Sequence, residues 1–275
     1  MISLATRILI CGLFLFAAGF ATAGPLDRLD ADRYGPGTLI AAIEELARYS
    51  PPQAVEPLLE LVGHPDRDVA RSVGWLLRRM GQGSQGAAAA GNVLADAEAE
   101  VEERISAAVC LGQLRHADGQ APLASALAND ADESVRAAAA RSLGELFRPG
   151  SAWALAQAAS TDESAAVRVA AILALSKVPD SDASAIVSAL QDSDPLVRRQ
   201  AAWSLALPRF RDATGLIGNL LRVLQSDADC RIQAAAAWAL GMIGDPSTSD
   251  ALEAAQDGGC RLTAQAASRA IEMIK

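Results

Sequence analysis

The chain has 275 residues, of which 51% are apolar and only 4% aromatic, and its formal net charge is −9. This composition is typical of an ordered globular protein and excludes a long disordered or low-complexity chain. A negative net charge repels phosphate backbones and anionic lipid, so we expect no nucleic acid and no membrane surface among the partners.

Residues 1–23 have the pattern of a secretory signal peptide. Arg7 precedes an apolar run over 8–20, and Ala21-Thr22-Ala23 then stands before Gly24, which predicts cleavage between Ala23 and Gly24. A membrane anchor is the alternative, but the run is short for a span of about 20 residues. We therefore expect an exported protein, periplasmic or extracellular, with no membrane segment after cleavage.

Residues 24–36 mix glycine, proline and charged residues without periodicity, which predicts a linker or a short N-terminal cover. Residues 37–275 are predicted to form one domain. It begins with a helix over 38–49, where apolar residues recur at helical spacing.

From residue 52 the chain repeats one pattern, seen in 194–205 as a capping acid, a Val-Arg anchor, two alanines and a leucine. A period of about 32 residues with two helical segments is the signature of an α-solenoid. The anchors are Val69, Glu103, Val135, Val167, Val197, Ile232 and Leu262. About seven helix pairs are expected, with first helices over 52–63, 86–96, 118–128, 150–159, 183–190, 211–225 and 247–256. The second helices are expected over 67–80, 100–114, 133–147, 165–178, 195–207, 230–243 and 260–274.

Two polar positions recur with the anchors. A side chain three residues earlier can cap the second helix, as in Asp66, Asp132, Ser164, Asp194 and Asp229. An acid five residues before the anchor and an arginine directly after it predict a structural ladder of ion pairs. The acids are Glu98, Asp130, Asp162, Asp192, Asp227 and Asp257, and the arginines are Arg104, Arg136, Arg168 and Arg198.

The pattern D-x-D-x-x-V-R-x-x-A-A-x-x-L-G, complete in 130–144, resembles the short HEAT repeats of the bilin-lyase-like type. The resemblance covers 52–275 and implies an all-α fold, a right-handed α-α superhelix. It is weak for activity, because the family includes scaffolds, chromophore lyases, a di-iron hydroxylase and DNA glycosylases. The hydroxylases bind iron through repeated His-Glu pairs, whereas the two histidines here, His64 and His116, precede proline and alanine.

No recognisable catalytic or metal motif is present, so we expect neither an enzyme nor a cofactor. The letters of a G-x-G-x-x-G motif at 81–86 follow a helix instead of a strand, which favours an inter-repeat loop over a dinucleotide site. Cys110 falls on an apolar stripe and is expected to be a buried thiol.

Cys230 and Cys260 hold equivalent positions in adjacent repeats, each two residues before its anchor. In an exported protein such a pair is a candidate disulfide. Stacked helices lie about 8–10 Å apart, whereas a bridge needs Cα atoms within about 7 Å. Two unpaired thiols therefore remain the alternative.

The residue six positions after each anchor points away from the core, at about 100° per helical residue. This column reads Trp75, Val109, Arg141, Leu173, Trp203, Trp238 and Ser268. In HEAT solenoids the second helices line the concave surface, so the column would form its floor. Tryptophan and arginine dominate binding hot spots, which favours a groove, whereas indoles that only cover neighbouring alanines are the alternative. Trp153, on a first helix, is expected in the core.

The sequence thus predicts an exported, non-catalytic scaffold or adaptor that binds a protein partner through its concave face. The alternatives are a lyase-like enzyme or chromophore-handling factor that uses the same groove, and a structural spacer without a groove ligand. The polar last helix favours a monomer. The predicted groove residues are Trp75, Arg141, Leu173, Arg199, Trp203, Trp238 and Met242.

Overall fold

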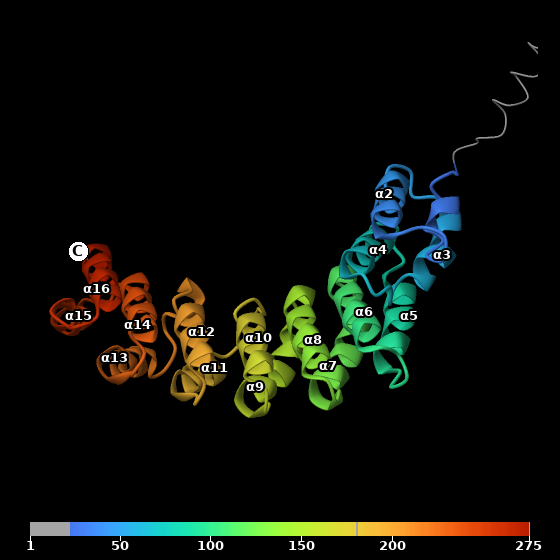
Figure 1. Cartoon of the computed structure of the whole chain (residues 1–275). Helices are drawn as coiled ribbons and strands as arrows, with labels where there is room; N and C mark the ends of the chain where they lie inside the picture. Colours follow the sequence, from blue (N-terminus) through green and yellow to red (C-terminus); the bar gives the residue numbers. More distant parts are fainter. Residues whose placement is uncertain (1–22, 180, 275) are drawn as a thin grey trace, which may run out of the picture.

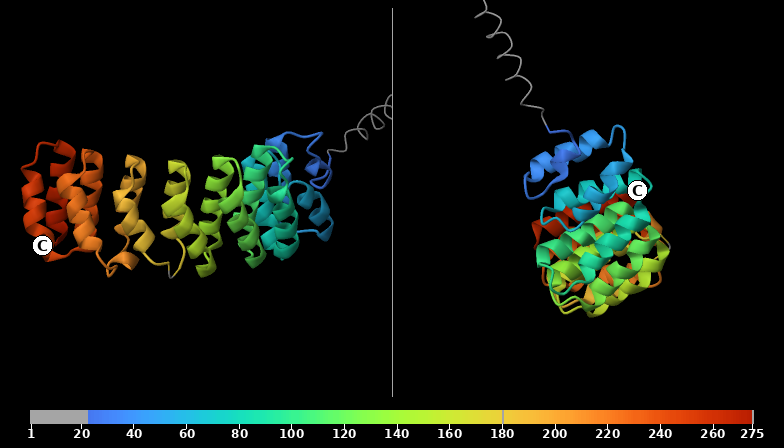
Figure 2. Two further views of the ribbon diagram at one scale, coloured as in Figure 1. Left: turned by 90° about the horizontal axis from the view of Figure 1, so that it is seen from below. Right: turned by 90° about the vertical axis from the view of Figure 1, so that its right-hand side faces the viewer.

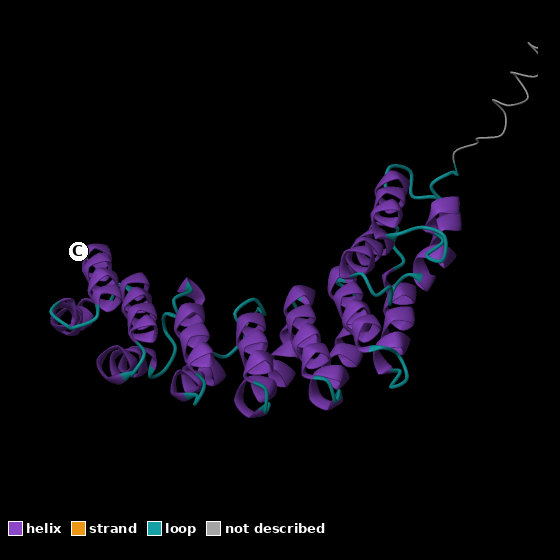
Figure 3. Ribbon diagram, in the orientation of Figure 1, coloured by secondary structure: helices purple, strands orange, loops and turns teal. Residues whose placement is uncertain are grey.

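The computed structural model describes residues 23–179 and 181–274, and residues 1–22 of the predicted signal peptide over 1–23 lie outside this part. The described residues form helices and connecting loops, with no strand among them (Figure 3). None of these helices is both long and apolar enough to cross a bilayer. The all-α solenoid expected from the sequence is confirmed.

Seven helix pairs follow a single N-terminal helix, α2 (Pro36–Leu46). The first helices of the pairs are α3 (Val55–Glu60), α5 (Gly83–Ala95), α7 (Gln120–Asn129), α9 (Ala152–Thr161), α11 (Ser184–Ser188), α13 (Leu216–Ser226) and α15 (Ser249–Gln256). The second helices are α4 (Arg67–Arg79), α6 (Val101–Leu114), α8 (Glu133–Leu146), α10 (Ala165–Leu175), α12 (Pro195–Leu205), α14 (Cys230–Ile243) and α16 (Arg261–Ile274).

The pairs stack side by side into a curved row (Figure 1). The second helices lie along the inner side of the curve, and the first helices lie along the outer side. A view turned by 90° shows the same row of helices edge to edge (Figure 2). The second helices therefore line the concave surface, which is where the predicted binding column should lie.

Small residues let the second helices approach closely. A Cβ added at Gly241 of α14 would lie 2.6 Å from the Cα of Ala270 on α16. A Cβ at Gly144 of α8 would lie 3.0 Å from the Cα of Ala174 on α10. The alanine-rich pattern of the sequence is thus a condition for this stacking distance, because protein interiors leave no room for an extra methyl group.

Four of the five predicted caps are present. The side chains of Asp66, Asp132, Asp194 and Asp229 each accept a hydrogen bond from a first-turn backbone N–H. The prediction for Ser164 was wrong, because its side chain makes no capping hydrogen bond to α10.

The first helices begin one to five residues away from their predicted starts, and two of these differences have a local cause. Helix α5 starts at Gly83 and includes Gly86, so most of the predicted loop over 81–86 is helical. Both glycines are buried, and a Cβ at Gly83 would lie 2.8 Å from the His116 side chain. Helix α13 starts only at Leu216, because Gly215 has a left-handed conformation with φ 74°.

The stretch predicted as a linker packs against α2. A 3-10 turn, η1 (Asp27–Leu29), buries Leu29, and Arg28 forms an ion pair with Glu45 of α2. At the predicted cleavage position, the backbone N–H of Gly24 donates to the Asp27 carboxylate at 3.0 Å. Residues 24–36 therefore match the short N-terminal cover better than a free linker.

Candidate functional site

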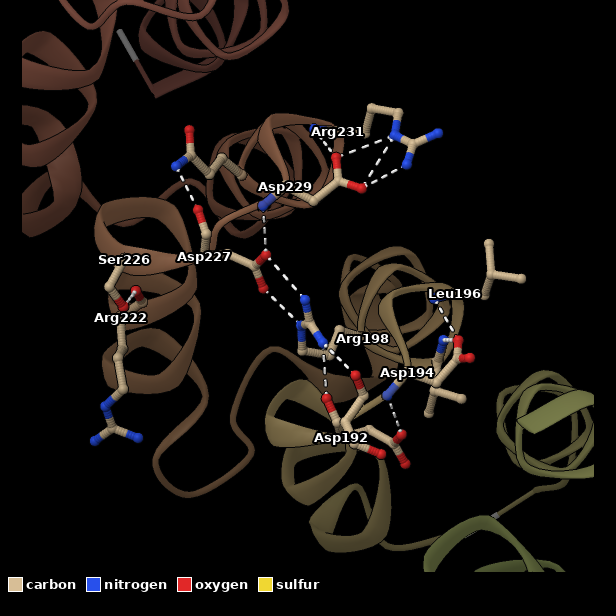
Figure 4. A network of polar contacts seen from close by, with 12 residues as sticks. Asp192, Asp194, Leu196, Arg198, Arg222, Ser226, Asp227, Asp229 and Arg231 are labelled. Atoms are coloured by element: carbon tan, nitrogen blue, oxygen red, sulfur yellow. Dashed lines mark hydrogen bonds and ion pairs between the residues drawn. The ribbon is translucent and has the colours of Figure 1, made fainter. Parts of the chain in front are cut away.

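Arginines directly after the anchors join four pairs of successive repeats. In the rung drawn in Figure 4, Nε and Nη2 of Arg198 donate to the two carboxylate oxygens of Asp227 at 2.7 and 3.1 Å. Its Nη1 donates to the carbonyls of Asp192 and Ser193, so one guanidinium also fixes the turn before its own helix. The predicted ladder is confirmed for four of its six acids, in the rungs Arg104–Asp130, Arg136–Asp162, Arg168–Asp192 and Arg198–Asp227, whereas Glu98 and Asp257 belong to none of these rungs.

The rungs are shielded from water, with 5% to 18% of each side chain exposed. The hydrogen bond to Asp227 raises the pKa of Arg198, against the opposing effect of burial. Burial alone would raise the pKa of Asp192, but hydrogen bonds from Arg168 and from the backbone N–H of Asp194 lower it. Both partners of the Arg168–Asp192 rung therefore stay charged. The ladder holds the second helices in fixed register.

The ladder changes its chemistry at the last repeat. Gln233 takes the arginine position, donates to the Asp227 carbonyl at 2.7 Å and accepts from Thr263 of α16 at 3.0 Å. Beside it, Cys230 and Cys260 form a disulfide with Cα atoms 6.2 Å apart. A covalent bond and neutral hydrogen bonds thus join α14 to α16 where an ion pair joins the earlier repeats.

The predicted column lies on the solvent side of the second helices. Trp75, Arg141, Leu173 and Trp203 are exposed, as is the flanking Met242, whereas Arg199 and Trp238 are half-buried. Two members of the column, Trp203 on α12 and Trp238 on α14, are in contact: their ring centroids lie 4.5 Å apart at an interplanar angle of 46°.

The tryptophan pair has an apolar surrounding on three neighbouring second helices. Trp238 packs against the core and contacts the ring of Trp203, a residue that is 46% exposed. Leu173 on α10 and Met242 on α14 are exposed on the same face. We call these four residues the concave apolar patch.

The column is not continuous from end to end. Trp75 on α4 lies under the guanidinium of Arg79, whose Cζ is 5.8 Å from the ring centroid. Val109 is half-buried and Arg141 is charged, so they separate Trp75 from the patch. The structure therefore brings Trp203 and Trp238 together, places Leu173 at the equivalent exposed position of α10, and leaves Trp75 as a separate feature.

Two aromatic residues lie where sequence reasoning did not place them. Trp153 on α9 is 74% exposed, so its expected position in the core was wrong. It follows the 3-10 turn η4 (Pro149–Ser151) at the start of α9, before the first buried leucine of that helix. Phe147, at the end of α8, is 61% exposed. The turns after α4 and α14 contain a glycine with positive φ, Gly81 or Gly244. Phe147 takes the same place after α8, so a comparison of the repeats could have singled it out.

Residues that could bind a metal ion are dispersed over the described part of the chain. Its histidines, cysteines and carboxylates nowhere form a group of three or more that could hold a metal ion. Cys110 is the buried free thiol predicted, and burial raises its pKa to about 12. A thiol held protonated in this way is a poor nucleophile at neutral pH.

One family model, described as HEAT repeats, matches this chain three times, over residues 89–176, 121–205 and 183–272. No curated protein matches the chain.

Among solved structures, karyopherin Kap121p bound to the extreme C-terminus of the protein phosphatase Cdc14p is 15% identical, with a TM-score of 0.61. That alignment covers 94% of this chain but only 33% of the karyopherin. YibA of Escherichia coli is 17% identical over 88% of this chain and 98% of its own, with a TM-score of 0.55. The CpcE–CpcF complex of phycocyanin lyase from Nostoc is 20% identical over 80% and 94%, with a TM-score of 0.42.

At these identities the structural likeness concerns the fold alone. The three overlapping family matches, however, extend from residue 89 to residue 272 and include both helices of most repeats. The chain therefore belongs to the HEAT-repeat family.

Proposed function

We propose that this protein is a non-catalytic scaffold that binds a protein partner at the concave apolar patch. The observation that carries the proposal is the tryptophan pair. The exposed indole of Trp203 is in tilted contact with the half-buried indole of Trp238, so it is held in place before any partner arrives. A rigid aromatic side chain loses little conformational entropy on binding, and such residues form most interface hot spots.

Several features support a protein partner over a small ligand. The patch extends over three helices, α10, α12 and α14, which lie on the concave side of the row (Figure 1). Three of its four residues are exposed. Small molecules prefer enclosed cavities, whereas a protein segment can cover a long curved face. The karyopherin that shares this architecture is itself bound to a segment of another protein.

We also propose that the protein acts outside the cytoplasm. The predicted signal peptide and the disulfide between Cys230 and Cys260 both support this location, since structural disulfides persist in oxidising compartments. Fractionation of the native cell, with thiol labelling of the protein before and after reduction, tests it. Protein in the cytosolic fraction with both thiols free would contradict the proposal.

The binding function is tested by affinity capture from the native envelope fraction. The wild type is compared with a Trp203→Ala, Trp238→Ala variant and with Trp153→Ala as a matched control. The control removes a more exposed indole from the outer side of the solenoid. We expect a partner that the wild type and the control capture and the double variant loses.

The loss of a hot-spot pair should weaken binding at least 30-fold, which is about 2 kcal/mol. A Leu173→Ser variant should also weaken binding while leaving the stacked indoles intact. Capture of the same partner by all variants would contradict the proposal. Visible absorbance in the purified protein would instead favour the chromophore-handling alternative.

A further inference from the structure

A hollow lies at the edge of the solenoid, beyond the ends of α8, α10 and α12, and has a volume of about 620 Å³. Its apolar wall is formed by Phe147 and Leu207, which are 61% and 39% exposed. Charged side chains at or just after the ends of four successive second helices, α6, α8, α10 and α12, form the rest of the lining. They are Arg115, Glu145, Lys177 and Arg209. We call this feature the edge hollow.

Phe147 has a backbone conformation that an aromatic residue rarely takes. Its φ of 56° and ψ of 46° are left-handed, and this conformation is unfavourable for residues with a Cβ. Gly81 and Gly244, in the left-handed turns that follow α4 and α14, adopt it without cost. A phenylalanine that is both strained and exposed does not stabilise the fold, and strained residues often serve binding sites.

The charge of the edge hollow is opposite to that of the whole chain. Lys177 forms an ion pair with Glu145 at 2.5 Å, and Arg115 reaches the same carboxylate at 3.9 Å. Arg209 donates to the carbonyls of Ser176 and Val178. Three cations with one carboxylate thus give a local charge of +2, whereas the chain carries −9.

We propose that the edge hollow binds a short segment of a partner protein in which an apolar side chain stands beside carboxylates. The apolar side chain would pack on Phe147 and Leu207, and the carboxylates would pair with Lys177 and Arg115. These cations already share one carboxylate, so each can donate a further charge-assisted hydrogen bond. An anionic membrane has similar charge, but a hollowed site on a chain of −9 fits a protein segment better.

The edge hollow lies beyond the ends of helices that carry the concave apolar patch. Lys177 and Leu207 follow the ends of α10 and α12, four residues after Leu173 and Trp203 in sequence. Neither Trp203 nor Trp238 lines the hollow. The second site is therefore independent of the tryptophan pair, and its test can fail or succeed by itself.

The test uses random dodecapeptides displayed on phage and selected on the immobilised protein. Each binder is then tested against a Phe147→Gly variant. We expect the peptides that depend on Phe147 to combine acidic residues with an aromatic or aliphatic one. Their synthetic versions should bind Phe147→Gly and Lys177→Gln at least tenfold more weakly than wild type in fluorescence anisotropy. Arg269→Gln, which removes an exposed cation from α16, is the control and should bind normally.

Thermal unfolding separates binding from folding. Glycine suits the left-handed position, so the melting temperature of Phe147→Gly should equal or exceed that of the wild type. A large fall in melting temperature would identify Phe147 as a structural residue and contradict the proposal. So would Phe147-dependent peptides that are basic or uncharged, or the absence of any Phe147-dependent binder. Phe147-dependent binding to vesicles with 30% anionic lipid, with no such peptide selected, would contradict a protein segment as the ligand. It would identify a membrane surface as the ligand instead.

Discussion

Replacement of Arg136 by methionine should destabilise the solenoid more than any exposed charge change. The Arg136 guanidinium donates to both carboxylate oxygens of Asp162, at 2.9 and 3.1 Å. It also donates to the carbonyls of Asp130 and Ala131, at 3.0 and 3.2 Å. Methionine keeps the apolar stem but removes every one of these donors.

The magnitude follows from what the substitution leaves behind. Arg136 and Asp162 are only 8% and 9% exposed, so the remaining carboxylate is an unpaired charge with little water around it. Removal of one partner from a buried pair costs about 3–5 kcal/mol. Because Asp162 still accepts a hydrogen bond from the backbone N–H of Ser164, we expect the lower end, about 3 kcal/mol.

Circular dichroism at 222 nm during heating measures the effect. A loss of about 3 kcal/mol lowers the melting temperature by roughly 6–12 °C in a chain of this size. Arg136→Lys should fall between the wild type and methionine, because an ammonium cannot form the paired hydrogen bonds. Arg231→Met is the control, since Arg231 is exposed and pairs only within its own turn with Asp229. Equal melting temperatures for Arg136→Met and the control would refute the structural role of the ladder.

Three further substitutions test other parts of the fold. The pKa of Asp192 is lowered in the folded state, so its ionised form stabilises the protein above pH 4 and the stabilisation is lost as the pH falls through that folded pKa. Asp192→Asn should therefore be less stable at pH 7 and lose less stability between pH 5 and pH 3, and parallel pH profiles of the melting temperature would contradict this. Cys230→Ser removes a bridge that closes a loop of 30 residues, a loss of about 3–4 kcal/mol, and a wild type whose melting temperature ignores reductant would argue against the bridge. Gly241→Ala places a methyl group against Ala270 and should cost on the order of 1–3 kcal/mol, whereas Gly218→Ala, with open space around it, should not destabilise. Equal melting temperatures for the two glycine variants would contradict the close helix approach.

The repeat architecture could be predicted because the same local signals recur in every copy. The second helices begin at the predicted residues or one residue later. Their starts are set by local signals, the capping acid and the first residues of the apolar period, which lie within a few residues of the helix start. The ladder was predictable for the same reason: a fixed spacing in each repeat becomes a fixed distance between stacked repeats.

The failures concern features that depend on neighbouring helices or on backbone conformation. Glycine is a poor helix former, yet Gly83 and Gly86 are helical because α5 needs small residues to approach α6. The left-handed conformation of Gly215 delays a helix without a clear sequence signal, whereas that of Phe147 is indicated only by comparison with Gly81 and Gly244 in the equivalent turns. The exposure of Trp153 depends on where the 3-10 turn before α9 ends.

The candidate site was predictable in part. Helix geometry placed Leu173, Trp203 and Trp238 on one face, because the angle per residue is the same in every second helix. It could not give the contact between the two indoles, which depends on the distance between α12 and α14 and on side-chain rotamers. For the edge hollow it gave no indication, because the lining comes from four segments that are distant in sequence.

Oxidative footprinting of the captured complex tests the central claim most directly, since Trp203 and Trp153 are both exposed in the free protein. Hydroxyl radicals modify accessible indoles, and mass spectrometry reads the two tryptophans in one sample. We predict that the partner protects Trp203 at least fivefold and leaves Trp153 as reactive as in the free protein. Protection of Trp153 with Trp203 still fully reactive would place the partner on the outer side and contradict binding at the concave surface.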